Sequence, residues 1–302
     1  MIARGLETSA SQCTPTLTAS IFTKVHHMAS KLIIDVGMHK GEDTGFYLER
    51  GHKVVGVEAN PTLVAELRSK FSSYISTGNL VIIDKAIAEE PGVVDFYIND
   101  QNSVWGSIDP AFVKRNARDG HTASQVIQVP CITMEDVVSR FPDPYYIKID
   151  VEGMDLSCLR SLSRSACRPR YISIESSVSS PADRWSEELT LFQDMGYDTF
   201  KFVDQARLDH LNGSILNREG SATTYKHVRE ASGPFGEETP GEWMRVDHAA
   251  STARRLRREF ETYSPMSSTP RPVVKMFRGL RKLRGLPVPD GWYDLHARHS
   301  SH

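Results

Sequence analysis

Short apolar runs recur along the first two thirds of the chain and predict a series of buried strands. These runs lie at 32–34, 53–58, 80–84, 145–151, 170–175 and 197–203. Helices are predicted between them at 42–50, at 155–162, at 182–195 and around Leu63, Leu67 and Phe71, which recur at helical spacing. Strands that alternate with helices in this way predict an α/β fold, with a parallel sheet and helices on both of its faces.

Acidic residues close several of the predicted strands. Asp35 follows the first apolar run, Glu58 ends the second and Asp84 ends the third, while Glu175 ends the run at 170–175. The carboxyl ends of parallel strands meet at one edge of a sheet, and ligands bind in the crevice at that edge in open α/β folds. We therefore expect a ligand-binding site there.

The stretch 31–44, K-L-I-I-D-V-G-M-H-K-G-E-D-T, combines a strand, a tight turn and a helix start. Gly37 and Gly41 permit left-handed dihedrals and close approach of a ligand, and the free N–H groups of the helix start favour an anionic group. The spacing is G-x-x-x-G rather than the dinucleotide pattern G-x-G-x-x-G, and a purely structural turn is the alternative. Glu58 follows about 20 positions later, where a ribose-binding carboxylate lies in doubly wound nucleotide folds.

Two β-rich stretches, at 93–98 and 126–132, have no clear helical period between them and predict a hairpin-like insertion. The polar loop at 102–109, which contains Trp105, is either a lid over a substrate or an ordinary surface loop. Thr133 is expected to cap the helix that follows.

With 302 residues, of which 25% are charged and 39% hydrophobic, the composition is typical of a globular protein. We expect a disordered leader at 1–30, one domain at 31–250 and a basic extension at 251–302. A net charge of −2 gives no overall attraction to nucleic acid. No apolar run approaches the roughly 20 residues that span a bilayer, and four cysteines without a C-x-x-C pair favour a reducing, cytoplasmic setting.

Basic residues gather at 271–284, with no acidic residue among them. The cations are Arg271, Lys275, Arg278, Arg281, Lys282 and Arg284, and Val273, Phe277, Leu280 and Leu283 recur near helical spacing. Such a basic amphipathic segment favours peripheral contact with an anionic membrane. The alternative is an apolar stripe that packs on the domain while the cations face water.

Three strings carry a resemblance to a known family. D-V-G-M-H-K-G-E-D-T at 35–44, V-E-A-N-P at 57–61 and Y-I-K-I-D-V-E-G-M-D at 146–155 resemble the FkbM family of S-adenosylmethionine-dependent methyltransferases, over roughly residues 31–203. The resemblance implies a Rossmann-like class I methyltransferase sheet, mostly parallel with one antiparallel strand. Family members mostly methylate hydroxyls of sugars, glycans or polyketide-type products, so the implied acceptor is a glycan or a small molecule.

The resemblance also implies roles for individual residues. The implied cofactor-binding residues, which would hold S-adenosylmethionine, are Asp35, Gly37, His39, Gly41, Thr44, Glu58, Asn60 and Asp84. Asp84 is the loosest match, as the polar residue after the third strand near the adenine. Met38-His39 departs from the family, which commonly has a small residue and then Asn at these positions.

Transfer to a hydroxyl needs in-line positioning and a base that takes the proton. Asp150, Glu152 and Glu175 fall at the predicted carboxyl edge of the sheet and are the candidates for this role. Lys148 lies inside an apolar strand, so it is either paired with a carboxylate or functional, because an unpaired buried ammonium is costly. His39 is the nearby imidazole, although it could simply fill the loop.

Other functions are compatible with the same pattern. One is a nicotinamide dehydrogenase, against which the missing G-x-G-x-x-G argues, and another is a glycan-binding or scaffold protein that kept the fold without the chemistry. No metal site is expected. His296 and His299 have the spacing of a metal-ligand pair, but a solvated terminus is the favoured interpretation.

Overall fold

The computed structural model describes residues 30–99, 103–118, 125–180, 183–206, 218–228, 231–265, 267–286, 288 and 292–300. Within these ranges the chain forms an eight-stranded sheet of order β10-β9-β11-β8-β7-β1-β2-β3 and a three-stranded sheet of order β4-β6-β5. The expected leader, apart from residue 30, lies outside them.

The strands of the main sheet are β1 (Leu32–Val36), β2 (Lys53–Val57), β3 (Leu80–Ile83), β7 (Tyr146–Ile149), β8 (Tyr171–Glu175), β9 (Thr199–Asp204), β10 (Met244–Arg245) and β11 (Tyr293–Arg298). Those of the small sheet are β4 (Ala86–Ile87), β5 (Gly92–Ile98) and β6 (Gln125–Ile132). The α-helices are α1 (Glu42–Glu49), α2 (Pro61–Lys70), α3 (Ser72–Ser76), α4 (Pro110–Arg118), α5 (Met134–Arg140), α6 (Asp155–Arg164), α7 (Trp185–Asp194), α8 (Val246–Tyr263) and α9 (Arg271–Leu283). Short 3₁₀ turns are η1 (Ser103–Trp105), η2 (Ser177–Ser179) and η4 (Gly236–Glu238).

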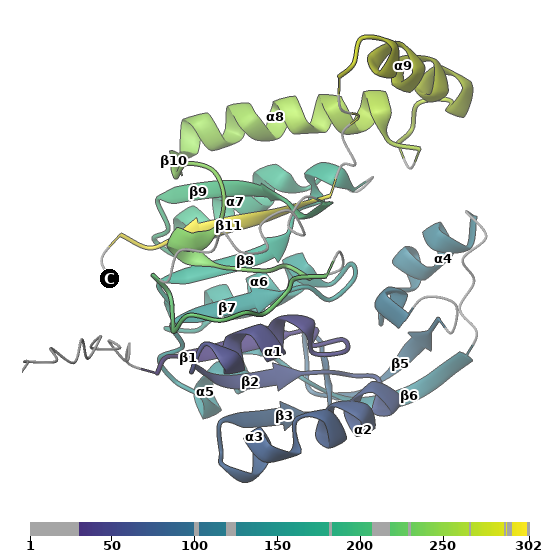
Figure 1. The fold of residues 1–302 in the computed structure, drawn as a ribbon. Coiled ribbons are helices and arrows are strands. Elements are labelled where there is room, and N and C mark those ends of the chain that lie inside the picture. The colour runs from purple at the N-terminus through teal and green to yellow at the C-terminus, as the bar shows by residue number, and fades with distance from the viewer. Residues whose placement is uncertain are drawn as a thin grey trace, which may run out of the picture.

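The central strands confirm the predicted α/β alternation (Figure 1). Each of the six predicted strands is present, and β8, β7, β1, β2 and β3 run parallel to one another. β11 pairs antiparallel with both β8 and β9, and the two-residue β10 adds a second antiparallel strand at the edge. The large sheet is therefore mostly parallel, as the fold class requires.

The two faces of the sheet bury different kinds of side chain, because successive residues of a strand point to opposite faces. Ile147 of β7 belongs to an aliphatic core shared with α5, α6 and α7. Tyr146 points to the opposite face, where an aromatic core includes Phe46 and Tyr47 of α1 and Phe235. The Tyr146 and Phe235 rings stack with their centroids 4.3 Å apart. Residues 231–243 thus cover part of a face on which helices alone were expected.

The predicted insertion forms the small sheet, in which β5 and β6 pair antiparallel and β4 joins β6. One expectation there is wrong, since α4 lies between β5 and β6 where no helical period is visible in the sequence. Phe112 and Asn116, four residues apart, are both buried. The inward position one turn after Phe112 is polar, and this breaks the apolar period that would have marked the helix. Thr133 does cap α5, in a reciprocal capping box with Asp136.

The C-terminal part of the chain corrects the expected domain boundary at residue 250. α8 runs across that boundary and buries Ala249, Ala253, Leu256 and Phe260. β11 lies between β8 and β9, inside the main sheet. The domain therefore extends beyond residue 250, and much of the expected extension is part of it. Among the described residues, no helix is both long enough and apolar enough to cross a bilayer.

The expectation of a solvated C-terminus is also wrong for His296, which is 1% exposed within β11. Residues three apart in a strand point to opposite faces, so the two histidines cannot meet as a metal-ligand pair. His299 instead packs edge-on against Tyr197, with the ring centroids 5.2 Å apart.

We predict that Leu295→Ala lowers the free energy of unfolding by about 2–5 kcal/mol, because the side chain is fully buried in β11 and its removal leaves a cavity. Leu283→Ala is the matched control, since Leu283 is 85% exposed and its replacement should change stability by less than about 0.5 kcal/mol. Urea denaturation of both variants measures the difference. Equal stabilities would show that β11 is not part of the core.

Candidate functional site

A cleft lies at the carboxyl ends of β1, β2 and β7, between the main sheet and the small sheet. Its empty volume is about 840 Å³, including the part open to solvent. From β1 the chain adds β2 and β3 on one side and later β7 and β8 on the other, so the strand order has a switch point at β1. Ligands of open α/β sheets bind at such a switch point. The residues that line it include Gly37, His39, Glu42, Asp43, Glu58, Asn60, Ile87, Ser103, Ser107, Lys148, Asp150 and Glu152.

Glycine is required in the turn after β1. Gly37 has a φ of 84°, and a Cβ there would lie 1.8 Å from the carbonyl oxygen of Asp150. Gly41, at the N-cap of α1, has a φ of 74°, and a Cβ there would lie 2.4 Å from the Phe71 ring. Any side chain at either position would push the turn away from its neighbours. Gly37 therefore lets the loops after β1 and β7 pack together at the floor of the cleft.

Glu58 is fixed by backbone hydrogen bonds. It is 8% exposed, and its Oε2 accepts from the N–H of His39 at 2.9 Å while its Oε1 accepts from the N–H of Asn60 at 2.8 Å. Burial raises the pKa of Glu58, and the two N–H donors oppose that rise. Each carboxylate oxygen has a further lone pair. Glu58 can thus accept further hydrogen bonding from a ligand in the cleft.

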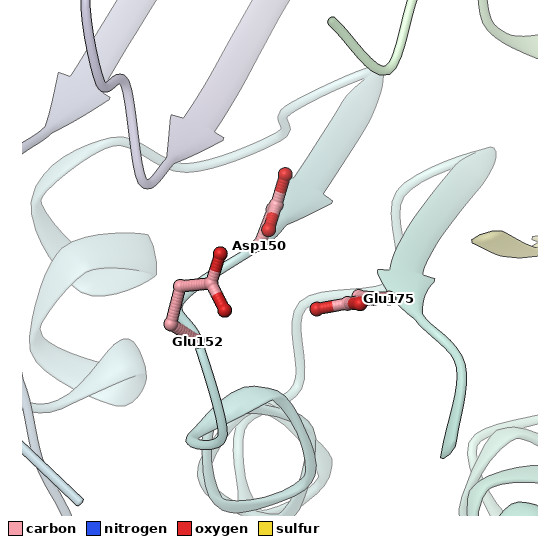
Figure 2. A group of neighbouring side chains, drawn as sticks. All are labelled: Asp150, Glu152 and Glu175. Atoms are coloured by element: carbon pink, nitrogen blue, oxygen red, sulfur yellow. The ribbon is translucent and has the colours of Figure 1, made fainter. Parts of the chain in front are cut away.

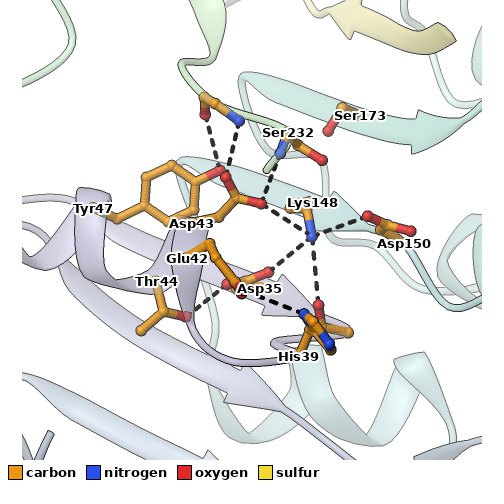
Figure 3. Close-up of polar contacts among 12 residues, drawn as sticks. Asp35, His39, Glu42, Asp43, Thr44, Tyr47, Lys148, Asp150, Ser173 and Ser232 are labelled. Atoms are coloured by element: carbon orange, nitrogen blue, oxygen red, sulfur yellow. Dashed lines mark hydrogen bonds and ion pairs between the residues drawn. The ribbon is translucent and has the colours of Figure 1, made fainter. Parts of the chain in front are cut away.

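Lys148 lies at the centre of three carboxylates (Figure 3). Its Nζ is 3.5 Å from Asp35 Oδ1, 3.4 Å from Asp43 Oδ2 and 3.3 Å from Asp150 Oδ2, and the residue is 3% exposed. Burial disfavours its charge, but the three carboxylates together raise the pKa of Lys148 well above its usual value. The sequence predicted that this lysine is either paired with a carboxylate or functional, and in the structure it is paired.

Asp35 and Asp43 are themselves anchored. Asp35 accepts a hydrogen bond from Thr44 Oγ1 at 2.6 Å. Burial raises the pKa of Asp35 to about 6, although Lys148 lowers it in opposition. Asp43 accepts from the N–H groups of Ser232, at 3.0 Å, and Gly233, at 2.9 Å. The lysine cluster therefore also holds a segment almost 190 residues further along the chain.

Two further carboxylates, Glu152 and Glu175, converge on Asp150 beside this cluster. One oxygen from each of Asp150, Glu152 and Glu175 lies within 4.8 Å of the others (Figure 2). Burial, and after it the charge of a neighbouring carboxylate, raises the pKa of Glu152 and that of Glu175 well above the usual value. Carboxylates at this separation repel one another when all of them are ionised, so the group is suited to hold a proton near neutral pH. The same three oxygens form the kind of donor set that hard cations accept.

The loop at 103–108 forms a wall of the cleft. Ser103 Oγ lies 2.8 Å from His39 Nε2, and His39 Nδ1 lies 3.4 Å from Glu42 Oε1. Ser107 Oγ donates to the carbonyl oxygen of Glu152 at 2.7 Å. The loop therefore lines the cleft, where a lid or substrate loop would have to lie.

The predicted site residues fall into three groups. Gly37, His39, Glu58, Asn60, Lys148, Asp150 and Glu152 line the cleft. Asp35, Gly41 and Thr44 support it from behind, and Glu175 joins it through Asp150 and Glu152. Asp84 is outside, because its side chain is 62% exposed and pairs with Arg68 at 3.2 Å. The geometry gives no support to Asp84 as a neighbour of the adenine, and Ile87 lines the cleft instead.

Sequence reasoning missed Asp43 and Asp294. Asp43 follows Gly41 in the first motif, and its place in the first turn of α1 was the signal available. Asp294 is 3% exposed in β11 opposite Glu175, and burial, with Asp150 in addition, raises its pKa well above the usual value. No local pattern marks Asp294, since it lies in the tail that was expected to be solvated.

A switch-point cleft with a glycine turn and a fixed acid after β2 defines a doubly wound α/β ligand-binding protein. The family described as "Methyltransferase FkbM domain" matches residues 35–199, more than half of the chain. The protein therefore belongs to the FkbM methyltransferase family, which confirms the resemblance seen in the three sequence strings. No curated protein matches the chain.

Solved structures of methyltransferases match parts of the chain at low identity. A methyltransferase FkbM from Methylobacillus flagellatus KT is 15% identical, with a TM-score of 0.38, over 57% of this chain and 40% of that one. A putative sarcosine dimethylglycine methyltransferase from Galdieria sulphuraria is 11% identical, with a TM-score of 0.36, over 90% and 78%. Magnesium protoporphyrin IX methyltransferase from Synechocystis PCC 6803, solved with bound SAM, is 11% identical, with a TM-score of 0.32, over 57% and 62%. The chain thus spans about two fifths of the first of these relatives.

We predict that Lys148→Met lowers the free energy of unfolding by about 3–5 kcal/mol, because it leaves buried carboxylates without their cation. The loss should be larger above pH 6 than below it. Asp35, whose pKa of about 6 rises further without the lysine, takes up a proton in the folded state at low pH and loses its charge. Thermal and urea unfolding across this pH range measure the effect.

Lys53→Met is the control for this variant, because Lys53 is exposed at the start of β2. Its unfolding should match that of the unaltered protein at every pH. A loss in Lys148→Met that does not depend on pH would mean that packing, rather than charge, is what Lys148 contributes.

Proposed function

We propose that this protein transfers a methyl group from S-adenosylmethionine to a hydroxyl of a glycan, a sugar or a related metabolite. The observation that supports this most directly is the pairing in one cleft of a fixed ribose-type acid, Glu58, with a proton-accepting group of carboxylates, Asp150, Glu152 and Glu175. The first feature suits the donor, and the second suits a hydroxyl acceptor.

The residues of the cleft fit the donor. Glu58 lines the cleft and can accept hydrogen bonds from the ribose hydroxyls, while Asn60 beside it caps the start of α2. Apolar side chains, among them Leu63, Ile87 and Phe96, offer a surface for a flat base. The close approach allowed by Gly37 would hold the amino-acid end of the cofactor. When bound, S-adenosylmethionine supplies a methyl group already activated on a sulfonium.

Other residues of the cleft would act on the acceptor. Glu152, whose pKa is raised by burial and by Asp150, is suited to accept the proton of an acceptor hydroxyl as the oxygen attacks the methyl carbon. Glu175 lies beside it and can share that proton. The loop at 103–108 would exclude water and orient the acceptor, since Ser107 is bonded to the backbone at Glu152.

A cytoplasmic setting is part of this proposal. The described cysteines, Cys131, Cys158 and Cys167, are free thiols, and the first two are buried. Burial raises the pKa of Cys158 well above the usual value, so this thiol is poorly reactive. Free thiols in the core are the pattern of a protein that works in a reducing compartment.

Glu58→Ala should weaken binding of S-adenosylhomocysteine, the reaction product, by about 10- to 100-fold, because hydrogen bonds to a charged group contribute about 1.5–3 kcal/mol. Isothermal titration calorimetry measures this change. Asp84→Ala is the matched control and should bind normally, since Asp84 lies outside the cleft. An unchanged dissociation constant in a folded Glu58→Ala protein would contradict the ribose assignment, and tighter binding of NAD than of S-adenosylhomocysteine would favour the dehydrogenase.

Asp150→Asn and Glu152→Gln should each lower turnover by ~10²–10⁴-fold, with little change in affinity for S-adenosylhomocysteine, because Glu152 takes the proton only in the chemical step and Asp150 positions the groups beside it. The acceptor is found first, by mass spectrometry of metabolites and glycans incubated with enzyme and methyl-labelled donor. Since burial and Asp150 raise the Glu152 pKa, turnover should rise with pH through a value above the 4.5 of an ordinary glutamate. Glu152→Gln should abolish that rise.

Glu135→Gln serves as the control for these variants, because Glu135 pairs with Arg164 at the surface, 2.9 Å away. Near-normal turnover in both cleft variants would move the base to Glu175 or His39. Normal binding of S-adenosylhomocysteine without transfer to any hydroxyl would support a non-catalytic scaffold instead.

A further inference from the structure

α9 exposes an apolar face that is not buried against the described part of the domain. Met276 is 53% exposed, Phe277 37%, Leu280 46% and Leu283 85%. Successive residues of a helix are about 100° apart, so these four side chains, together with Val273, occupy a continuous arc of roughly 120°. A methionine, a phenylalanine and two leucines on one exposed arc form a contiguous apolar patch. Scattered single apolar residues, which are normal on protein surfaces, do not form such a patch.

α9 is held to the domain along a different edge. Val274 is buried, and it is the one buried residue of this helix, all of which the structure describes. Arg278 donates to the carbonyl oxygen of Tyr263 at 2.9 Å, and the Arg281 guanidinium lies 5.0 Å from the Tyr263 ring. These contacts fasten α9 to the end of α8, and they leave the apolar arc facing away from the contact. α9 is therefore held against the domain along one edge, and its apolar arc is exposed.

The charged residues of this segment are all of one sign. Residues 271–284 contain six cations and no acid, in a chain whose net charge is −2. By helical spacing, Arg271, Lys275, Arg278 and Lys282 fall on the side opposite the exposed apolar arc. A basic face opposite an arc of Phe, Leu and Met is the arrangement of helices that lie in a bilayer interface. Neither a purely aqueous helix nor a contact with nucleic acid requires the apolar arc.

We propose that α9 docks the protein on the surface of an anionic phospholipid bilayer. The apolar arc enters the boundary between headgroups and acyl chains, and Lys275 and Lys282 lie among the lipid phosphates. In Figure 1, α9 lies beyond the end of α8, on the side of the molecule toward which the parallel strands point. α9 and the carboxyl edge of the sheet, where the cleft lies, are therefore on the same side of the molecule. This inference does not depend on the reaction proposed above.

Co-sedimentation of the full chain with vesicles tests the proposal. The protein should partition onto vesicles that contain phosphatidylglycerol, stay in solution with phosphatidylcholine alone, and dissociate as salt is raised. Lys275→Ala/Lys282→Ala should reduce partitioning by roughly 30-fold, because each cation near an anionic surface contributes about fivefold. Phe277→Ser/Leu280→Ser should reduce it by at least about tenfold, since both side chains lose burial in the interface.

Val93→Ser/Val126→Ser is the matched control. Both valines are exposed in the small sheet, Val93 by 65% and Val126 by 52%, so the same kind of surface change is made far from α9 in the chain. This control should partition normally. All variants should keep the unfolding temperature and the S-adenosylhomocysteine affinity of the unaltered protein, which separates failure of docking from failure of the proposed reaction.

Three results would overturn the proposal. The first is that the folded full chain ignores anionic vesicles at low salt. The second is that only the lysine variant loses binding, or that single-stranded RNA competes fully with vesicles, either of which would mean a general contact with polyanions. The third is that Phe277→Ser/Leu280→Ser unfolds several degrees lower than the control, which would mean that the apolar arc packs within the domain.

Discussion

The buried ammonium of Lys148 is the interaction on which the site depends. A cation withdrawn from water loses several kcal/mol of hydration unless carboxylates replace it, and here three of them do, Asp35, Asp43 and Asp150. They come from β1, from the first turn of α1 and from the loop after β7. Satisfying one ammonium therefore fixes these three segments relative to one another, and the same three segments form walls of the cleft.

Placing charge on one face of the sheet constrains what can cover that face. Residues paired in register point the same way, so Lys148 and Ser173 share this face, as do Glu175 and Asp294 further along. The sides of a helix offer no free N–H groups, whereas an irregular segment does. The chain near residue 232 donates two N–H groups to Asp43 and so covers the charged region without leaving it unpaired. The opposite face, lined by residues such as Ile147, is covered by helices.

The central fold was predictable because its strands and helices are marked by local apolar patterns. Glu58 was predictable for a related reason, since the distance between the first turn and the end of the second strand is nearly constant in such folds. β11 could not be found in this way, because only Leu295 and Ala297 face the aliphatic core while Asp294 and His296 face the charged side. The sequence of a strand that faces an apolar environment on one side and a charged one on the other resembles that of a polar tail. Asp43 and Asp294 become site residues only through partners about 100 or more positions away along the chain.

Asp150 is where the lysine cluster and the acidic group meet. Its carboxylate contacts Lys148 on one side and lies close to Glu152 and Glu175 on the other, so the ion pair and the acidic repulsion act through the same residue. Glu152 has a φ of 46°, a left-handed conformation that is unfavourable for a residue with a side chain. Such strain persists only where the surroundings hold it, and here Ser107 is bonded to the Glu152 carbonyl. Within the proposed function, Asp150 is therefore the positioning partner of the lysine, and Glu152, with its raised pKa and enforced orientation, is the better placed of the two to take up the proton.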